Sequence, residues 1–312
     1  MKYLQLVRYQ NLLLLAFMQL IFRYGFLIHQ DIGLGPSLSD IQYGLLVLST
    51  VLLAAGGYVI NDIFDQDTDS ENKPNNTLVG KSISEGNAYY IYVGLTLTGV
   101  AIGMYLSNVI QKPGFVSIFI FIAALLYFYA STLKQMLLIG NIVVAALLGF
   151  SVLIIGFFDL FPAIYEGNEK RMSLLFSILK DYAIFAFILN FIREIVKDLE
   201  DVNGDYNQGM RTLPIVLGIK RTSKVVFVLL LIPILILAYY VYKNIIENSL
   251  FLAAMYSLVF IIAPLLFCAI QMWSAKTKKD FHLVSVILKW VIFFGILSIT
   301  VITYNIINNV TS

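Results

Sequence analysis

The chain has 312 residues, of which 59% are hydrophobic and only 13% are charged. A soluble globular domain carries roughly 25% charged residues, so the composition excludes a water-soluble enzyme and a disordered chain. The single cysteine, Cys268, excludes a structural disulfide, and the net charge of +2 gives no indication of nucleic-acid binding. A helical membrane protein that crosses the bilayer several times remains, and we expect one domain over residues 1–312.

Apolar runs of about 18 or more residues predict membrane-spanning helices. The sequence contains such runs near 11–28, 41–62, 88–108, 115–131, 138–158, 174–197, 223–243, 250–272 and 284–306. These runs predict an all-α fold with about nine transmembrane helices.

The basic residues gather in alternate loops, which predicts the orientation of the chain in the membrane. Because positive loops stay in the cytoplasm, we expect the N-terminus and the loops after even-numbered spans to be cytoplasmic. An odd number of spans then places the C-terminus outside. On this interpretation Lys276, Lys278 and Lys279 anchor the topology, and His29 and His282 are isolated residues that form no shared metal site.

Ten of the 19 acidic residues lie in two short stretches, five in 62–71 and five in 194–205. They are Asp62, Asp65, Asp67, Asp69 and Glu71, and Glu194, Asp198, Glu200, Asp201 and Asp205. Each stretch follows the cytoplasmic end of a predicted span, the second and the sixth. Acidic residues beside membrane spans are costly, and they indicate a functional site.

Within these stretches, two sets of three oxygen-bearing side chains recur at helical spacing, so each set shares one helix face. The sets are Asn61, Asp65 and Asp69, and Asp198, Asp201 and Asp205. Stacked carboxylates at the C-terminal end of a helix repel one another and require a cation. Carboxylate and amide oxygens suit Mg²⁺, which proteins usually hold with a few carboxylates plus substrate phosphates.

Basic residues accompany both stretches and balance their charge: Lys73, Lys81, Lys134, Arg193, Lys197 and Arg211. Of these, Lys73, Lys134 and Arg193 could also bind phosphate oxygens. The residues alone therefore predict a membrane-embedded site for an anionic phosphate group bound through a divalent metal. A ligand with a phosphate head and a long hydrocarbon tail, taken up from the bilayer, fits such a site.

At these two stretches the chain resembles the UbiA superfamily of intramembrane prenyltransferases. The family motif Asn-x-x-x-Asp-x-x-x-Asp is matched by Asn61, Asp65 and Asp69, and the motif Asp-x-x-x-Asp by Asp201 and Asp205. The segments Lys73–Asn75 and 209–214 also agree with the family pattern. The resemblance implies a UbiA-like helical bundle with a central cavity and cytoplasmic cap loops at 63–87 and 198–222.

Within the superfamily, segments 133–141 and 193–205 are most similar to the digeranylgeranylglyceryl phosphate synthase branch. That branch attaches a geranylgeranyl group to a glycerol-phosphate ether lipid. Two positions depart from the family pattern: Asn76 and Thr77 replace an Arg-Pro pair, and the opening segment Arg8–Asn11 lacks a Pro. The lost Arg weakens a phosphate contact and bears on the choice of acceptor more than on the metal ligands.

The resemblance implies that a prenyl diphosphate binds through Mg²⁺ to both acidic stretches and ionises to an allylic cation. The implied metal ligands are Asn61, Asp62, Asp65, Asp69, Asp198, Asp201 and Asp205. The implied substrate-binding residues are Arg8, Asn11, Lys73, Lys134, Arg193, Lys197 and Arg211. The implied catalytic residues are Asp65, Asp201, Lys134 and Tyr129, the last through its aromatic face.

Two alternatives stay open from the sequence. The same prenyl transfer could serve an aromatic, quinone-type acceptor. A membrane transporter could use the acids for ions or protons, although transporters keep such charges near the bilayer midplane. The resemblance implies an integral membrane protein of a prokaryotic plasma or inner membrane, with a prenyl diphosphate and a lipid-like acceptor as partners.

Overall fold

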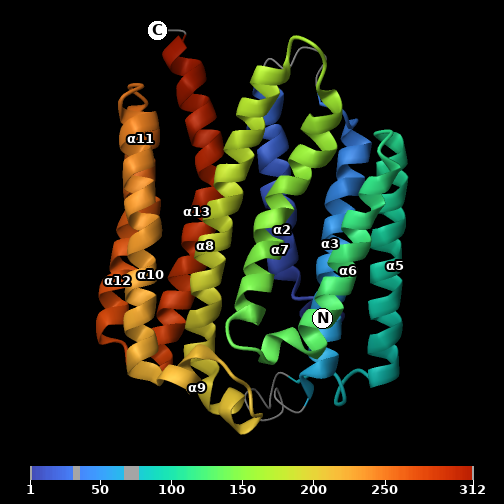
Figure 1. Cartoon of the computed structure of the whole chain (residues 1–312), viewed down its shortest axis with the longest axis vertical. Coiled ribbons are helices and arrows are strands. Elements are labelled where there is room, and N and C mark those ends of the chain that lie inside the picture. Colours follow the sequence, from blue (N-terminus) through green and yellow to red (C-terminus); the bar gives the residue numbers. More distant parts are fainter. Residues whose placement is uncertain (1, 31–35, 67–76, 311–312) are drawn as a thin grey trace. The chain divides into compact units, whose positions relative to one another are not determined.

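The computed structural model describes residues 2–30, 36–66 and 77–310. In these residues nine helices are long and apolar enough to cross a membrane (Figure 1). Their helical segments run Tyr9–His29, Asp40–Phe64, Glu85–Val109, Pro113–Ser131, Ile139–Ala163, Glu169–Asn207, Ile219–Ile246, Phe251–Ser274 and Lys278–Asn309. All nine predicted spans are confirmed, and the described residues form no extended strand.

By its internal contacts the chain divides into two compact units. The first comprises residues 1–20, 31–143 and 150–180, and the second comprises residues 21–30, 144–149 and 181–312. The prediction of a single domain over 1–312 stays a prediction.

The first unit contains the N-terminal helices. They are α1 (Lys2–Leu6), α2 (Tyr9–Tyr24, in part), α3 (Asp40–Phe64), α5 (Glu85–Val109), α6 (Val116–Ser131) and both ends of α7 (Ile139–Ile155). Helix α3 begins with a capping box, in which Ser39 Oγ accepts from the Gln42 amide and Gln42 Oε1 accepts from the Ser39 amide.

Helices α3 and α5 pack closely through small residues. Ser49 Oγ donates to the Gly99 carbonyl at 2.7 Å, and a Cβ on Gly56 would lie 2.7 Å from Thr96 Oγ1. Small residues let helices approach in a membrane, where no hydrophobic force joins them. An apolar cluster of Leu6, Val59, Ile60 and Ile63, with residues of the 79–88 segment and α6, then supports the C-terminal end of α3.

The second unit contains most of α8 (Glu169–Asn207) and the C-terminal helices. These are α9 (Leu213–Leu217), α10 (Ile219–Tyr240), α11 (Phe251–Ser257), α12 (Ala263–Ser274) and α13 (Lys278–Val310). Helix α12 packs against α10 and α13, and α11 packs against α13. Helix α8 continues ten residues beyond the predicted end of its span at 197.

This extension corrects one expectation. The segment 198–222, which we expected to be a cap loop, is helical over most of its length, in α8, α9 and the start of α10. The helix can continue because 198–207 contains no proline and because Leu199, at 1% exposure, packs in the interior; the acids then lie on one side of it. The expected central cavity stays a prediction.

Candidate functional site

The first acidic motif lies at the C-terminal end of α3. The helix ends at Phe64, and the Asp65 amide still donates to the Asn61 carbonyl at 2.9 Å. Asn61 Nδ2 donates to Asp65 Oδ2 at 2.6 Å, so these two side chains share one face, as the four-residue spacing predicts. Asp69 and Lys73 lie outside the described residues.

Lys134 is brought to Asp65 from a distant part of the chain. It lies in a short 3-10 helix, Leu133–Gln135, between α6 and α7, and its Nζ donates to Asp65 Oδ1. The side chains of Lys134 and Asp65 are only 9% and 16% exposed. The turn is tight because Gly140 leaves room for it: a Cβ there would lie 2.8 Å from Lys134 Cα. The sequence placed Lys134 only at the end of the fourth span, so its contact with the first motif is a finding of the structure, and its roles in substrate binding and catalysis stay predictions.

Arg8 reaches the same helix end from the N-terminus. Its φ of 51° breaks the helical path between α1 and α2, a left-handed conformation that non-glycine residues rarely adopt. Its guanidinium donates to Asp62 Oδ1 at 2.9 Å and lies 4.9 Å from the centre of the Tyr58 ring. Asn11 Nδ2 donates to the Tyr58 hydroxyl at 3.3 Å. The structure therefore brings Arg8, Asn11 and Asp62 together around Tyr58.

The second acidic motif lies on the C-terminal part of α8. Asp198, Asp201 and Asp205 are all within this helix, so the predicted helical face is confirmed for this set. Asp205 is buried, at 9% exposure, and Asp201 accepts from Lys278 Nζ of α13 at 3.4 Å. Both motifs thus place their acids at the C-terminal end of a membrane helix, and a cation offsets the charge in each.

Arg193 and Lys197 precede these acids on α8 and are engaged by another acid. Lys197 Nζ donates to Glu194 Oε1 at 2.6 Å, and Arg193 Nη1 lies 3.8 Å from the same oxygen. Arg193 Nε also donates to the Ser285 carbonyl of α13 at 3.2 Å. In this structure both cations balance Glu194, Arg193 also joins α8 to α13, and the contact of either with substrate stays a prediction.

Two further predicted residues lie near the motifs in sequence. Tyr129 is partly buried in α6, five residues before Lys134, and Arg211 is exposed in the segment between α8 and α9. The aromatic role of Tyr129 and the phosphate role of Arg211 stay predictions.

The donor atoms suit a divalent ion of the magnesium type. Among the described residues, no three His, Cys, Asp or Glu side chains lie close enough together to hold a metal by themselves. Magnesium usually takes one or two carboxylates and completes its shell with water and substrate phosphates. Pairs of oxygen ligands such as Asn61 with Asp65, and the acids of α8, fit that requirement when a diphosphate supplies the remaining oxygens.

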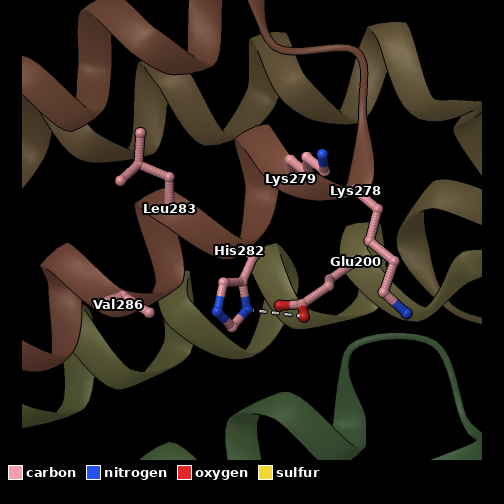
Figure 2. Close-up of a pocket in the computed structure, with 6 residues that line it drawn as sticks. All are labelled: Glu200, Lys278, Lys279, His282, Leu283 and Val286. Carbon is pink, nitrogen blue, oxygen red and sulfur yellow. Dashed lines mark hydrogen bonds and ion pairs between the residues drawn. The ribbon is translucent and has the colours of Figure 1, made fainter. Parts of the chain in front are cut away.

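Sequence reasoning missed a group of residues at the start of α13. Lys278 was interpreted as a topology anchor and His282 as an isolated histidine, yet Lys278 contacts Asp201 and His282 Nδ1 lies 3.0 Å from Glu200 Oε1 (Figure 2). These partners are separated by 77 and 82 residues. The only sequence signal was a basic segment preceding a span, which membrane topology explains equally well.

Comparison with known proteins adds an independent result. The digeranylgeranylglyceryl phosphate synthase of Saccharolobus solfataricus is 34% identical over 233 residues, covering 74% of each chain. The synthases of Sulfurisphaera tokodaii and Thermococcus sibiricus are 33% and 38% identical, and the match spans 63% and 61% of their lengths. The chain thus matches somewhat less than two thirds of the length of these two relatives.

The fold is shared with solved structures. A structure described for digeranylgeranylglyceryl phosphate synthase in membranes aligns over 97% of both chains with a TM-score of 0.60 and 24% identity. A UbiA homologue from Archaeoglobus fulgidus, bound to GPP and Mg²⁺, aligns over 96% of this chain and 99% of that chain, with a TM-score of 0.58 and 19% identity. The UbiA prenyltransferase family profile matches residues 32–305. From the match over most of its length, the chain belongs to the UbiA prenyltransferase family.

Proposed function

We propose that this protein transfers a geranylgeranyl group from its diphosphate to the hydroxyl of a glycerol-phosphate ether lipid, in a Mg²⁺-dependent reaction. One observation carries the proposal: two acidic motifs end two membrane helices, and each is joined by a lysine from a distant segment. The names of the relatives support the acceptor, and the GPP- and Mg²⁺-bound homologue supports the donor and the metal.

The acidic residues would hold the metal, and the cations would contact the diphosphate. The oxygen ligands would come from Asn61, Asp62, Asp65 and Asp69 of the first motif and from Asp198, Asp201 and Asp205 of the second. When bound, Mg²⁺ supplies positive charge that neutralises the diphosphate. Each motif would hold metal through its own oxygen ligands, and the diphosphate would supply the remaining oxygens.

The proposed reaction breaks the bond between C1 of the prenyl group and the diphosphate oxygen. The leaving diphosphate takes the electron pair, and Lys134 and Arg8 donate hydrogen bonds to oxygens whose negative charge grows. The allylic cation that remains is stabilised by an aromatic face such as Tyr129, by about 0.5–2 kcal/mol. The acceptor hydroxyl oxygen then bonds to C1 and gives its proton to the departed diphosphate, and exclusion of water prevents hydrolysis of the cation.

The distribution of basic residues supports an orientation for the protein. An odd number of spans would leave the two termini on opposite membrane sides, and the nine candidate spans of the described residues together with the positive-inside bias support a cytoplasmic N-terminus and cytoplasmic acidic motifs. The donor and the acceptor head would then be reached from the cytoplasmic side, with their hydrocarbon tails in the bilayer. The proposed location is the plasma or inner membrane of a prokaryote.

The test is a product assay on purified protein in nanodiscs. Radiolabelled geranylgeranyl diphosphate, Mg²⁺ and geranylgeranylglyceryl phosphate are incubated with and without EDTA, and the lipids are separated by chromatography. We expect a diether product that requires Mg²⁺ and that falls on the order of 100-fold in Asp65→Asn and Asp201→Asn. Glu85→Gln is the matched control, because Glu85 is an exposed acid at the start of α5.

Each contrary outcome would support a different function. Metal-dependent release of diphosphate without the diether would reject the lipid acceptor, and an aromatic quinone precursor would be assayed next. No turnover together with no metal-dependent binding of the diphosphate would reject the prenyl transfer and favour a transporter.

A further inference from the structure

An open groove lies beside the second acidic motif, between the end of α8 and the start of α13 (Figure 2). Its volume is about 580 Å³, within the usual range for small-molecule sites. It is lined by one glutamate, two lysines, one histidine and two apolar side chains: Glu200, Lys278, Lys279, His282, Leu283 and Val286.

The charges of the groove favour an anionic ligand. Among the described residues Glu200 is the one acid that lines it, and its Oε1 already lies 3.0 Å from His282 Nδ1. Lys278 Nζ contacts Asp201 at the edge of the groove, whereas Lys279 forms no ion pair with any described residue. The lining therefore carries two ammonium groups against one carboxylate. Lysine ammonium groups bind phosphate oxygens well.

The apolar residues of the groove continue along the same helix. Leu283 and Val286 are 43% and 39% exposed, although both lie within a membrane-spanning segment. Figure 2 shows them farther along α13 than Lys278 and Lys279. A charged end followed by an apolar strip matches an amphiphile with a phosphate head and a hydrocarbon chain.

The groove also adjoins the second acidic motif. Glu200 precedes Asp201 in the chain, and Lys278 contacts Asp201 directly. In a glycerol phosphate the reacting hydroxyl and the phosphate are on neighbouring carbons, so only a few bonds separate them. A phosphate held in the groove therefore keeps that hydroxyl near the second motif. An ordinary bilayer lipid does not react there, so its binding would not require a groove at this place.

We propose that this groove binds the phosphate of the lipid acceptor, with Lys278, Lys279 and His282 contacting the phosphate and Leu283 and Val286 contacting the start of its hydrocarbon chain. This inference rests on the proposed function. It assigns acceptor recognition to α13 and leaves recognition of the prenyl diphosphate to the two acidic motifs.

The test measures KM for each substrate separately in zwitterionic nanodiscs. Lys279→Glu and His282→Gln are the variants, since both residues are exposed and their replacement leaves the Asp201 contact intact. We expect KM for geranylgeranylglyceryl phosphate to rise about tenfold in Lys279→Glu and about threefold in His282→Gln, from lost hydrogen bonds to a charged group. KM for geranylgeranyl diphosphate should stay within about twofold of wild type, as expected for a surface substitution away from its site.

Three comparisons keep the inference separate from other causes. Lys276→Glu is the matched control, because Lys276 is an exposed lysine of the same segment that does not line the groove. With an acceptor that lacks the phosphate, wild type and Lys279→Glu should have equal rates. Addition of phosphatidylglycerol should leave the wild-type acceptor KM unchanged.

Defined results would overturn the inference. An unchanged acceptor KM in Lys279→Glu, an equal loss with the acceptor that lacks phosphate, or an equal effect of Lys276→Glu would each do so. A wild-type acceptor KM that rises with phosphatidylglycerol would assign the groove to anionic bilayer lipid instead. If wild type makes no diether, the proposed function fails, and the groove inference falls with it; if wild type makes diether and the variants behave like it, only the groove inference fails.

Discussion

The contact between Lys134 and Asp65 is the most testable feature of the first motif. Replacement of Lys134 by Met removes the ammonium while keeping most of the side-chain volume. The two side chains are 9% and 16% exposed, so solvent screens the Asp65 charge only weakly. Asp65 would keep the hydrogen bond from Asn61 Nδ2 at 2.6 Å, which limits the loss.

The size of the stability loss follows from the hydrogen bonds that Asp65 loses and keeps. A hydrogen bond to a charged group contributes about 1.5–3 kcal/mol, so we expect Lys134→Met to lower the free energy of unfolding by about 2 kcal/mol. For a chain of this size that corresponds to a Tm lower by roughly 4 °C. Since Lys134 is also proposed to contact the leaving diphosphate, kcat/KM should fall on the order of 100-fold.

The assay is a double-mutant cycle with Asp65→Asn, measured by thermal unfolding in detergent without substrate or metal. If the pair stabilises the fold, the two single effects overlap, and the double variant is less destabilised than their sum by about 1–2 kcal/mol. Strictly additive effects would refute the reasoning, because they would show that the two side chains do not interact. Lys134→Arg keeps a positive charge and should recover part of the loss in both measurements.

Two other substitutions test how the first motif is positioned. Gly140→Ala places a methyl group 2.8 Å from Lys134 Cα, so we expect a lower Tm and lower product formation; Gly94→Ala, whose Cβ meets nothing within 4 Å, is the control and should leave both unchanged. A Gly140→Ala protein with full activity would show that the turn tolerates displacement. Arg8→Gln removes the contact with Asp62, but because Arg8 is 42% exposed the Tm should change little, with a cost of about 0–1 kcal/mol. Its KM for the prenyl diphosphate should rise about tenfold if Arg8 binds phosphate, and an unchanged KM would remove it from the substrate-binding set.

The membrane spans and the helical spacing within each acidic motif could be predicted from the sequence, because both depend on residues that are close together in the chain. An apolar run long enough to cross the bilayer must form its hydrogen bonds within itself, so the runs at 41–62 and 88–108 became the helices Asp40–Phe64 and Glu85–Val109. The four-residue interval between Asn61 and Asp65 likewise predicted the contact that the structure shows. The same interval logic over 198–205 predicted a shared helix face, which α8 confirms, whereas the cap loop that the resemblance implied there was wrong.

The partners of the acids were decided only by tertiary structure. Arg8 and Asp62 are 54 residues apart, and Lys134 and Asp65 are 69 residues apart. Hydropathy and helical period repeat over a few residues and carry no information about which helix ends meet. What brings Lys134 to Asp65 is a close turn that Gly140 permits, and such a requirement is visible only when the packed atoms are in place.

The groove beside α13 likewise combines a feature that the sequence shows with contacts that only packing creates. The basic segment before the last span is visible in the sequence, and the positive-inside rule explains its charge. Only the tertiary structure placed His282 beside Glu200 and Lys278 beside Asp201, across about 80 residues of chain. Charge composition is a property of a segment, whereas a binding site is a property of the elements that pack around it, and packing decided which of these lysines face an acid.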